Sequence, residues 1–179
     1  MILGIIVAVL VFIILIWIIS TSNALNRTIV KVEEADSGID VALTKRYDVL
    51  TKMMDVVKAY KNYENETLLE VINLRKGMTM DEKVAENNKM NSNFEKLQVI
   101  AEAYPELKSS ENYKTLQQSI VEVEEHLQAA RRMYNANVSK FNQMLVTFPT
   151  SVIASSKRLS KKAFFEAESI KKEDVKINL

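Results

Sequence analysis

This chain has few of the residues that interrupt helices or carry common catalytic and metal-binding chemistry. Its 179 residues include no cysteine, one histidine, three glycines and two prolines. The lack of cysteine excludes disulfides, thiolate catalysis and cysteine-ligated metals. The scarcity of glycine and proline disfavours a β-rich domain with many turns and predicts long helices. A net charge of +1 gives no general attraction to nucleic acid.

The chain begins with a run, from Ile2 to Ile19, that has neither charged nor polar side chains. A helix of this length spans about 27 Å, close to the ~30 Å of a bilayer core. We therefore predict a transmembrane anchor over residues 1–20, with residues 2–19 in contact with the lipid bilayer. A cleaved signal sequence is the alternative, and Ser22 and Ala24 supply a passable site. The run lacks a basic start and exceeds the about 7–15 residues of the apolar segment within a signal sequence, which favours an anchor.

Basic residues next to the run predict its orientation. Only Met1 precedes it, whereas Arg27 and Lys31 follow it. Lys and Arg are enriched in cytoplasmic flanks. We expect a single-pass protein of the cell membrane, with its N-terminus outside and its helical domain in the cytoplasm.

Apolar residues after the anchor recur at steps of three and four, which is typical of a helix that buries one face. The pattern predicts one long helix, or two helices with a kink at Gly38, ending near Gly77. It continues from the anchor, so the two can form one rod. Its positions are Leu25, Ile29, Val32, Asp36, Ile39, Leu43, Arg46, Leu50, Met53, Val57, Tyr60, Glu64, Thr67, Val71 and Leu74.

Two further helices are predicted downstream. Thr79 and Glu82 have the spacing of a capping box, and the helix they open is polar at first, with asparagines expected to be exposed or frayed. Pro105 forces a stop or bend, and Ser109 or Ser110 can cap the next helix. That helix has the strongest apolar pattern and ends at Pro149. Its pattern runs through Tyr113, Leu116, Ile120, Val123, Leu127, Ala130, Tyr134, Asn137, Phe141, Met144 and Phe148.

The C-terminal stretch changes character at a basic cluster of Lys157, Arg158, Lys161 and Lys162, followed by a short amphipathic stretch over 163–168. Nucleic-acid binding is disfavoured because no aromatic residues interleave with the cluster. Contact with anionic lipid is a second interpretation, supported by the two phenylalanines nearby. We favour a solvated tail over both.

No pattern in the sequence predicts catalysis. His126 is the only histidine, and a di-iron bundle would need Glu where Val123 stands. We interpret His126 as a surface or boundary residue. No glycine-rich phosphate loop is present. We therefore predict no catalytic, cofactor-binding or metal-binding residues, and no cofactor.

Taken together, these residues resemble the LemA family of bacterial single-pass membrane proteins. The resemblance covers nearly the whole chain and is strongest in its second half. Its motifs include Ile39-Asp40-Val41, Lys45-Arg46, Ala101-Glu102-Ala103-Tyr104-Pro105-Glu106-Leu107-Lys108, Glu124, Ala130-Arg131-Arg132, Tyr134-Asn135, Phe141-Asn142, Phe148-Pro149 and Phe164-Phe165-Glu166-Ala167.

The chain departs from the family pattern at three places. Asp36 replaces a usual Trp, Ala42 a usual Gln, and Thr51-Lys52 a usual Pro-Asn. Losing that proline favours a continuous first helix. The resemblance implies a helical bundle on an N-terminal anchor, with the bundle in the cytoplasm. It implies no activity, because the family has no established catalytic residues.

We thus predict an all-α protein: an N-terminal transmembrane helix followed by a long antiparallel helical bundle of three to four helices. The bundle, with coiled-coil-like packing, spans residues 21–154, and a basic, amphipathic tail spans 155–179. We expect a non-enzymatic scaffold or interaction module with a protein partner at the membrane and no nucleic-acid partner. A homo-oligomer is compatible with the pattern. The alternative is an extracytoplasmic helical sensor or ligand-binding bundle.

Overall fold

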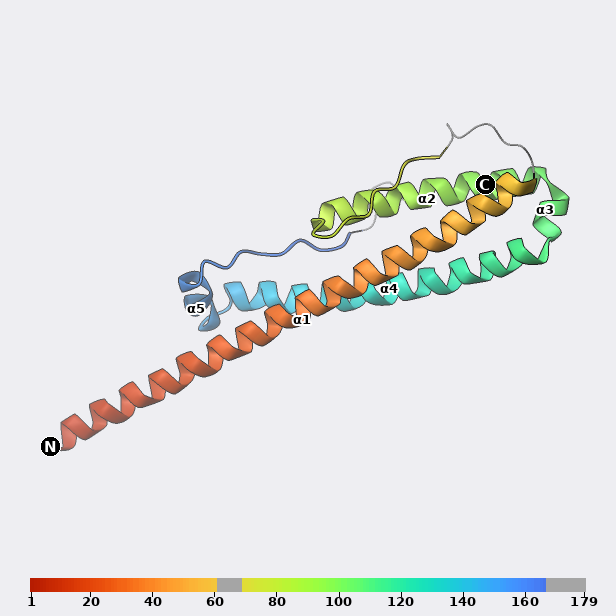
Figure 1. Ribbon diagram of the computed structural model, residues 1–179. Helices are drawn as coiled ribbons and strands as arrows, with labels where there is room; N and C mark the ends of the chain where they lie inside the picture. Colours follow the sequence, from red (N-terminus) through yellow and green to blue (C-terminus); the bar gives the residue numbers. More distant parts are fainter. Residues whose placement is uncertain (61–68, 167–179) are drawn as a thin grey trace, which may run out of the picture. The chain divides into compact units, whose positions relative to one another are not determined.

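The computed structural model describes residues 1–60 and 69–166, in which every regular element is a helix. An apolar N-terminal helix precedes the others (Figure 1), which confirms the predicted fold class. The helices are α1 (Ile2–Tyr60), α2 (Met80–Ala103), α3 (Pro105–Ser109), α4 (Glu111–Val146) and α5 (Thr150–Ser156).

The chain forms two compact units. Unit 1 comprises Met1–Ser37 and Met133–Ala163, and unit 2 comprises Gly38–Arg132 and Phe164–Leu179. Of unit 2, the structure describes residues 38–60, 69–132 and 164–166.

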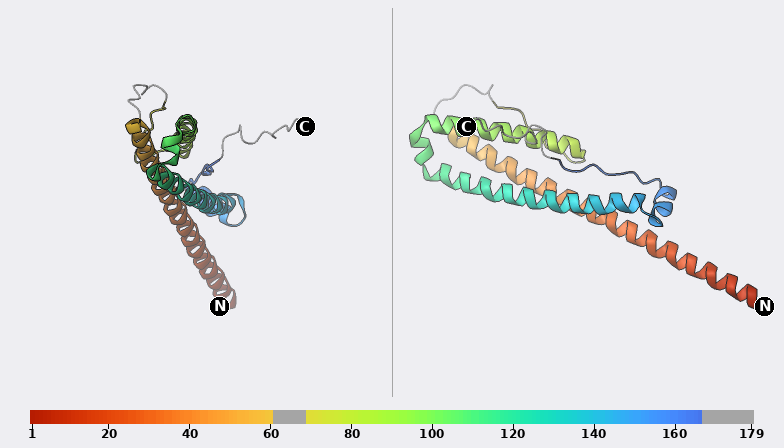
Figure 2. Two further views of the ribbon diagram at one scale, coloured as in Figure 1. Left: turned by 90° about the vertical axis from the view of Figure 1, so that its right-hand side faces the viewer. Right: turned by 180° about the vertical axis from the view of Figure 1, so that it is seen from behind.

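Helix α1 is one unbroken helix of 59 residues (Figure 2), and it passes through Gly38 without a break. Of the two predicted alternatives, the structure has the continuous helix, without a kink at Gly38. The predicted end near Gly77 is wrong, because residues 69–79 are irregular and Gly77 turns the chain at φ +76°. Of the expected helical positions beyond Tyr60, Glu64 and Thr67 lie outside the described residues.

Side chains of α2 bind part of the backbone of residues 69–79, which is not helical. The amide of Asn93 binds both the N–H and the carbonyl of Glu70, at 2.8 and 2.9 Å. The N–H of Asn73 donates to Glu86 Oε2 at 2.8 Å. Buried donors and acceptors are nearly always paired, and these bonds replace the helical ones.

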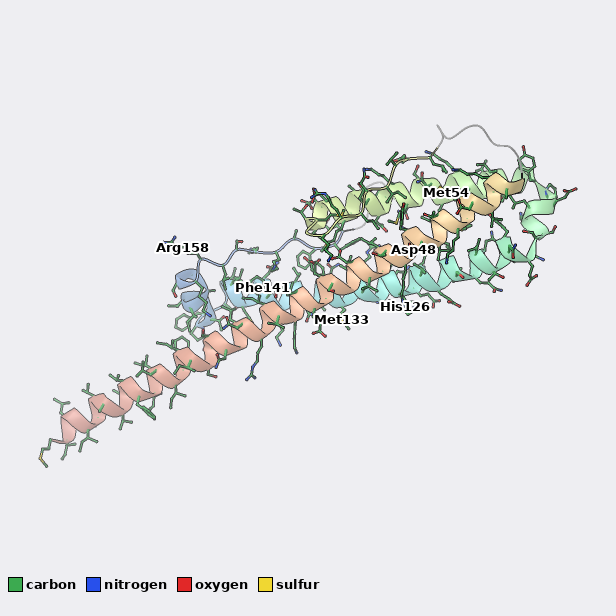
Figure 3. All side chains as sticks on the ribbon, viewed as in Figure 1. Asp48, Met54, His126, Met133, Phe141 and Arg158 are labelled. Carbon is green, nitrogen blue, oxygen red and sulfur yellow. The ribbon has the colours of Figure 1, made fainter. Side chains whose placement is uncertain are left out.

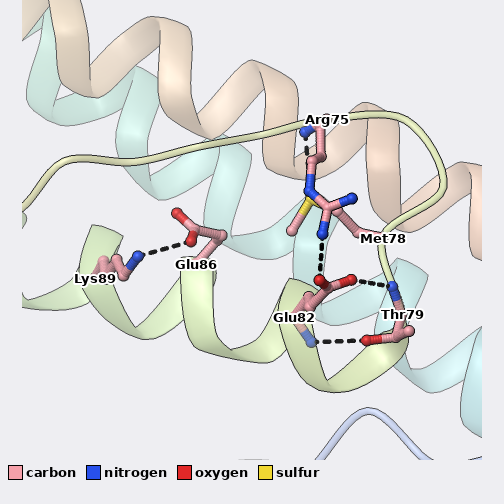
Figure 4. Close-up of polar contacts among 6 residues, drawn as sticks. All are labelled: Arg75, Met78, Thr79, Glu82, Glu86 and Lys89. Atoms are coloured by element: carbon pink, nitrogen blue, oxygen red, sulfur yellow. Dashed lines mark hydrogen bonds and ion pairs between the residues drawn. The ribbon is translucent and has the colours of Figure 1, made fainter.

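The predicted capping box opens α2 (Figure 4). Thr79 N–H donates to Glu82 Oε2 at 2.7 Å, and Glu82 N–H donates to Thr79 Oγ1 at 3.3 Å. The predicted stop at Pro105 is confirmed, since α2 ends at Ala103. Ser110 is the cap of the next helix, accepting a bond from Tyr113 N–H at 3.3 Å.

The core of unit 2 is built from α1, α2, α3 and α4. Its contacts show that α1 and α2 run in the same direction, because Asp40 pairs with Lys83 and Arg46 with Asn91. The apolar part of this core comprises Leu50, Met53, Val57, Met90, Leu97, Ala101, Leu107, Tyr113 and Ile120.

Unit 1 joins the first part of α1 to the end of α4 and to α5. Thr28 Oγ1 lies 3.4 Å from the sulfur of Met144, and Asn137 donates to the carbonyl of Lys31 at 3.3 Å. Later residues of α4 therefore contact earlier residues of α1, so the two helices are antiparallel here. The predicted seam is buried at Tyr134 and Phe141 but not at Phe148, which is 80% exposed because α4 ends before it, at Val146.

Candidate functional sites

The first candidate site is the apolar part of α1 within unit 1. The side chains of residues 2–19 are exposed on every face of the helix (Figure 3), and only Trp17 is half-buried. This stretch has a mean hydropathy of 3.5 over its best window, and α1 is the one helix in the described part of the chain apolar enough to cross a membrane. A signal sequence near the N-terminus can also contain a long apolar helix of this kind.

The second candidate site is a charged network inside unit 2, centred on Arg46. Its guanidinium is 3% exposed and binds α2 through Asn87 Oδ1 at 2.5 Å, Asn87 O at 3.2 Å and Asn91 Oδ1 at 2.7 Å. It also forms an ion pair with Glu124 of α4. An arginine donates several bonds in a fixed plane, so one side chain ties three helices together.

Lys83 of α2 is a second buried cation in this unit. It is 2% exposed, and its ammonium pairs with Asp40 Oδ1 of α1 at 2.7 Å. Burying an unpaired charge is costly, so each buried cation fixes where its partner helix can sit. Arg46 and Lys83 therefore set the register of α2 against α1.

Burial changes the pKa of several charged side chains in unit 2. It lowers the pKa of Arg46 from its ordinary value, and the charge of Glu124 opposes that shift. Burial likewise lowers the pKa of Arg131, again opposed by Glu124. Burial tends to raise the pKa of Glu86, but hydrogen bonds from Lys89 and the Asn73 N–H outweigh it and leave the pKa low.

The C-terminal Phe-Phe motif is anchored within unit 2. Phe165 is 2% exposed, and the guanidinium of Arg131 lies 4.6 Å from the centre of its ring. A cation over an aromatic face is attracted by the ring's quadrupole. Phe164 beside it is 40% exposed. Residues 163–166 have no regular secondary structure.

The residues before this motif are held within unit 1. Tyr134 Oη donates to the carbonyl of Ala163 at 3.0 Å. The amide of Asn142 donates to the carbonyl of Lys162 and accepts from its N–H, both at 2.9 Å. Burial, and then the charge of Asp36, raises the pKa of Tyr134 to about 12, so its hydroxyl stays protonated and able to donate.

The structure leaves His126 apart from these contacts, on the exposed surface of α4 (Figure 3). Within residues 1–60 and 69–166, no three His, Asp or Glu side chains are grouped to hold a metal. The expectation that the asparagines of α2 are exposed or frayed is wrong. Asn87 and Asn93 are buried because they bind Arg46 and the backbone of Glu70.

The sequence analysis noted Arg46 within an apolar pattern and the asparagines of α2, but it did not predict that they bind each other. Arg46 interrupts an apolar pattern on a buried face, which is the signal of a paired internal charge. The asparagine-rich start of α2 supplies the matching acceptors. Several family-like residues named above thus take part in charged contacts in unit 2: Asp40 pairs with Lys83, and Arg46, Glu124 and Arg131 interact with one another.

Two comparisons with known proteins support the family resemblance that these residues indicate. The sequence pattern of the LemA family matches residues 35–179. Protein LemA of Metamycoplasma hominis is 32% identical over 162 residues, which cover 88% of this chain and 74% of the relative. The chain belongs to the LemA family.

Proposed function

We propose that this LemA-type protein is a membrane-anchored, non-enzymatic helical bundle that acts as a scaffold or interaction module at the cytoplasmic face. The observation that carries the proposal is the change of surface along α1. Residues 2–19 expose apolar side chains all round, whereas Leu25, Val32, Ile39 and Leu43 are buried on one face. A continuous helix of this kind supports an anchor that is kept rather than removed.

The contacts of the buried charged side chains support the non-enzymatic part of the proposal. Arg46 and Lys83 bind side chains of neighbouring helices, and these contacts fix helix register. Arg131 binds Glu124 electrostatically and Phe165 through its ring. Such contacts stabilise a fold without requiring a substrate.

A scaffold role is supported by the anchor itself. Tethering raises the local concentration of a module toward partners in the same membrane and strengthens weak contacts. The expected partner is a membrane protein, or a second copy of this chain. Crosslinking and pull-down from membranes, with the apolar segment intact, would identify it.

Topology gives the direct test of this proposal. The natural chain has no cysteine, so single cysteines at the exposed positions Gln118 and Glu125 are unique labels. A membrane-impermeant thiol reagent should leave both unlabelled in intact cells and label both after the cells are lysed. Labelling in intact cells would overturn the cytoplasmic assignment and favour the extracytoplasmic sensor. Recovery of a chain lacking residues 1–24 would identify the run as a cleaved signal.

A further inference from the structure

The end of α4 and helix α5 cover α1 immediately beyond its apolar run. Thr21 and Leu25 are buried, and Lys157 Nζ donates to Asn26 Oδ1 at 2.9 Å. Asn26 follows Ile19 by seven residues, about 10 Å along a helix. A headgroup layer is roughly 5–8 Å thick on each side of the hydrocarbon core. If residues 2–19 span a bilayer, this part of unit 1 lies beside its surface.

The turn between α4 and α5 exposes apolar side chains at this level. Phe148 is 80% exposed, Val146 62% and Val152 58%. Met144 contacts Thr28, and α4 is antiparallel to α1, so residues after Met144 extend toward the apolar run. Phe148 and its neighbours therefore lie at the end of α4 nearest the apolar run.

Unit 1 has more than twice as many basic residues as acidic residues. Its three acidic residues are Glu33, Glu34 and Asp36 on α1, and none occurs in residues 1–32 or 133–163. The same stretches carry seven basic residues. These are Arg27, Lys31, Lys140, Lys157, Arg158, Lys161 and Lys162.

The basic cluster at 157–162 is exposed and follows α5 directly (Figure 3 labels Arg158 there). Anionic lipid attracts basic residues close to a membrane surface, and exposed apolar side chains beside them can enter the headgroup boundary. The sequence suggested the phenylalanines at 164 and 165 as the apolar partners of the cluster. Phe165 is buried, so Phe148 and Val152 fill that role instead.

We propose that Val146, Phe148 and Val152, together with Lys157, Arg158, Lys161 and Lys162, form an interfacial patch that binds the anionic lipid surface around the anchor. The proposal rests on the membrane anchorage proposed above. In this arrangement the anchor has a second membrane contact, which restrains rotation of unit 1 about α1.

Tryptophan fluorescence of the full chain in lipid vesicles tests the patch, because Trp17 is the only tryptophan. Three single-tryptophan proteins are compared: the natural chain, Trp17→Phe with Phe148→Trp, and Trp17→Phe with Val30→Trp. Val30 is 60% exposed and about 16 Å beyond Ile19 along α1. The vesicles contain phosphatidylcholine brominated near the top of the acyl chain, with or without phosphatidylglycerol.

We expect Trp17 to be quenched in both vesicles, the reporter at 148 to be quenched more strongly when phosphatidylglycerol is present, and the reporter at 30 to remain bright. Replacing Lys157, Lys161 and Lys162 with Gln should remove the effect of phosphatidylglycerol at 148. Replacing the exposed Lys45, Lys52 and Lys58 of unit 2 with Gln is the matched control, and should leave it unchanged.

Two failures are distinguishable. A bright reporter at 148, with Trp17 quenched, would overturn the patch and leave the anchor intact. An unquenched Trp17 would overturn the anchorage. Val152→Trp in the Trp17→Phe chain gives a second reporter if Phe148→Trp lowers the helix content measured by circular dichroism, and its quenching decides the proposal in the same way.

Discussion

The two units are held by different kinds of polar contact. Unit 2 buries two cations, Arg46 and Lys83, each paired with side chains of neighbouring helices. In unit 1 the bonds from Tyr134 to Ala163 and between Asn142 and Lys162 join uncharged groups, and the charged Lys157 binds Asn26 at the surface. In unit 1 the basic side chains of the cluster at 157–162 are exposed instead.

This difference follows from what each kind of contact does. A buried ion pair adds little to stability, but it favours one particular register of the helices. In every other register the buried charge would have no partner. Neutral hydrogen bonds hold a segment in place at a lower desolvation cost. Unit 2 is therefore specified by charge pairing, and unit 1 keeps its charges at the surface, where the proposed lipid contact needs them.

The largest effect is expected when the charge pairing of unit 2 is removed. Arg46→Ala should lower the free energy of unfolding by about 3 kcal/mol, because Asn87 and Glu124 lose their partner inside the protein. Thermal unfolding followed by circular dichroism in mild detergent measures the loss. Lys45→Ala removes a neighbouring but exposed cation and should change stability by less than ~0.5 kcal/mol. Equal effects of the two substitutions would remove the distinction between the units.

The next effect concerns the Phe-Phe motif. Phe165→Ala should cost about 3 kcal/mol, because it leaves a cavity and removes the ring beneath Arg131. Phe164→Ala is the matched control on the next residue, which is 40% exposed, and should cost well under half as much. Thermal unfolding measures stability, and limited proteolysis measures cleavage after Ala163. Unchanged proteolysis of Phe165→Ala would contradict the role of this ring as an anchor.

Most of the fold followed from apolar spacing. The one-sided patterns predicted α1 and α4, and Thr79 with Glu82 predicted the start of α2. The end of α1 did not follow, because Val71 and Leu74 continue its spacing although residues 69–79 are irregular. Asn93 and Glu86, far along the chain, satisfy the backbone there. The spacing of apolar residues within one segment does not indicate which distant side chains bind its backbone.

Less of the candidate sites could be predicted. The apolar run is visible directly, because membrane helices are identified by composition. The buried network is visible only as an arginine within an apolar pattern, and its acceptors lie 41 residues or more away. The interfacial patch at the α4–α5 turn could not be predicted without the fold, because it depends on where α4 ends beside α1.

A smaller effect is expected in unit 1. Tyr134→Phe removes the hydroxyl that binds the Ala163 carbonyl and should cost about 1 kcal/mol. The pKa of Tyr134 is raised to about 12 from an ordinary value of 10.0, so the unfolded chain loses this proton first as pH rises. Stability from the protonated hydroxyl is complete below pH 10 and falls between pH 10 and about 12.

Unfolding measured from pH 9 to 12 tests this dependence, and Tyr134→Phe should fall less steeply than the natural chain across that interval. Tyr47→Phe changes an exposed tyrosine of unit 2 and should keep the natural profile. A profile of Tyr134→Phe identical to that of the natural chain would show that the hydroxyl contributes nothing to holding residues 157–163.

The smallest effect is expected at His126, a polar residue of unit 2 outside its charge pairing. Its side chain is exposed on α4, so His126→Ala should change the free energy of unfolding by less than ~0.5 kcal/mol. Alanine also favours a helix slightly more than histidine, which offsets small losses. Thermal unfolding gives the stability, and titration with zinc gives the stoichiometry of any bound metal. Two results would contradict this expectation: a loss of stability as large as that of Arg46→Ala, or stoichiometric zinc binding that His126→Ala abolishes. Either result would mean that unit 2 uses an exposed side chain for binding. The contrast between its buried and exposed polar groups would then no longer hold.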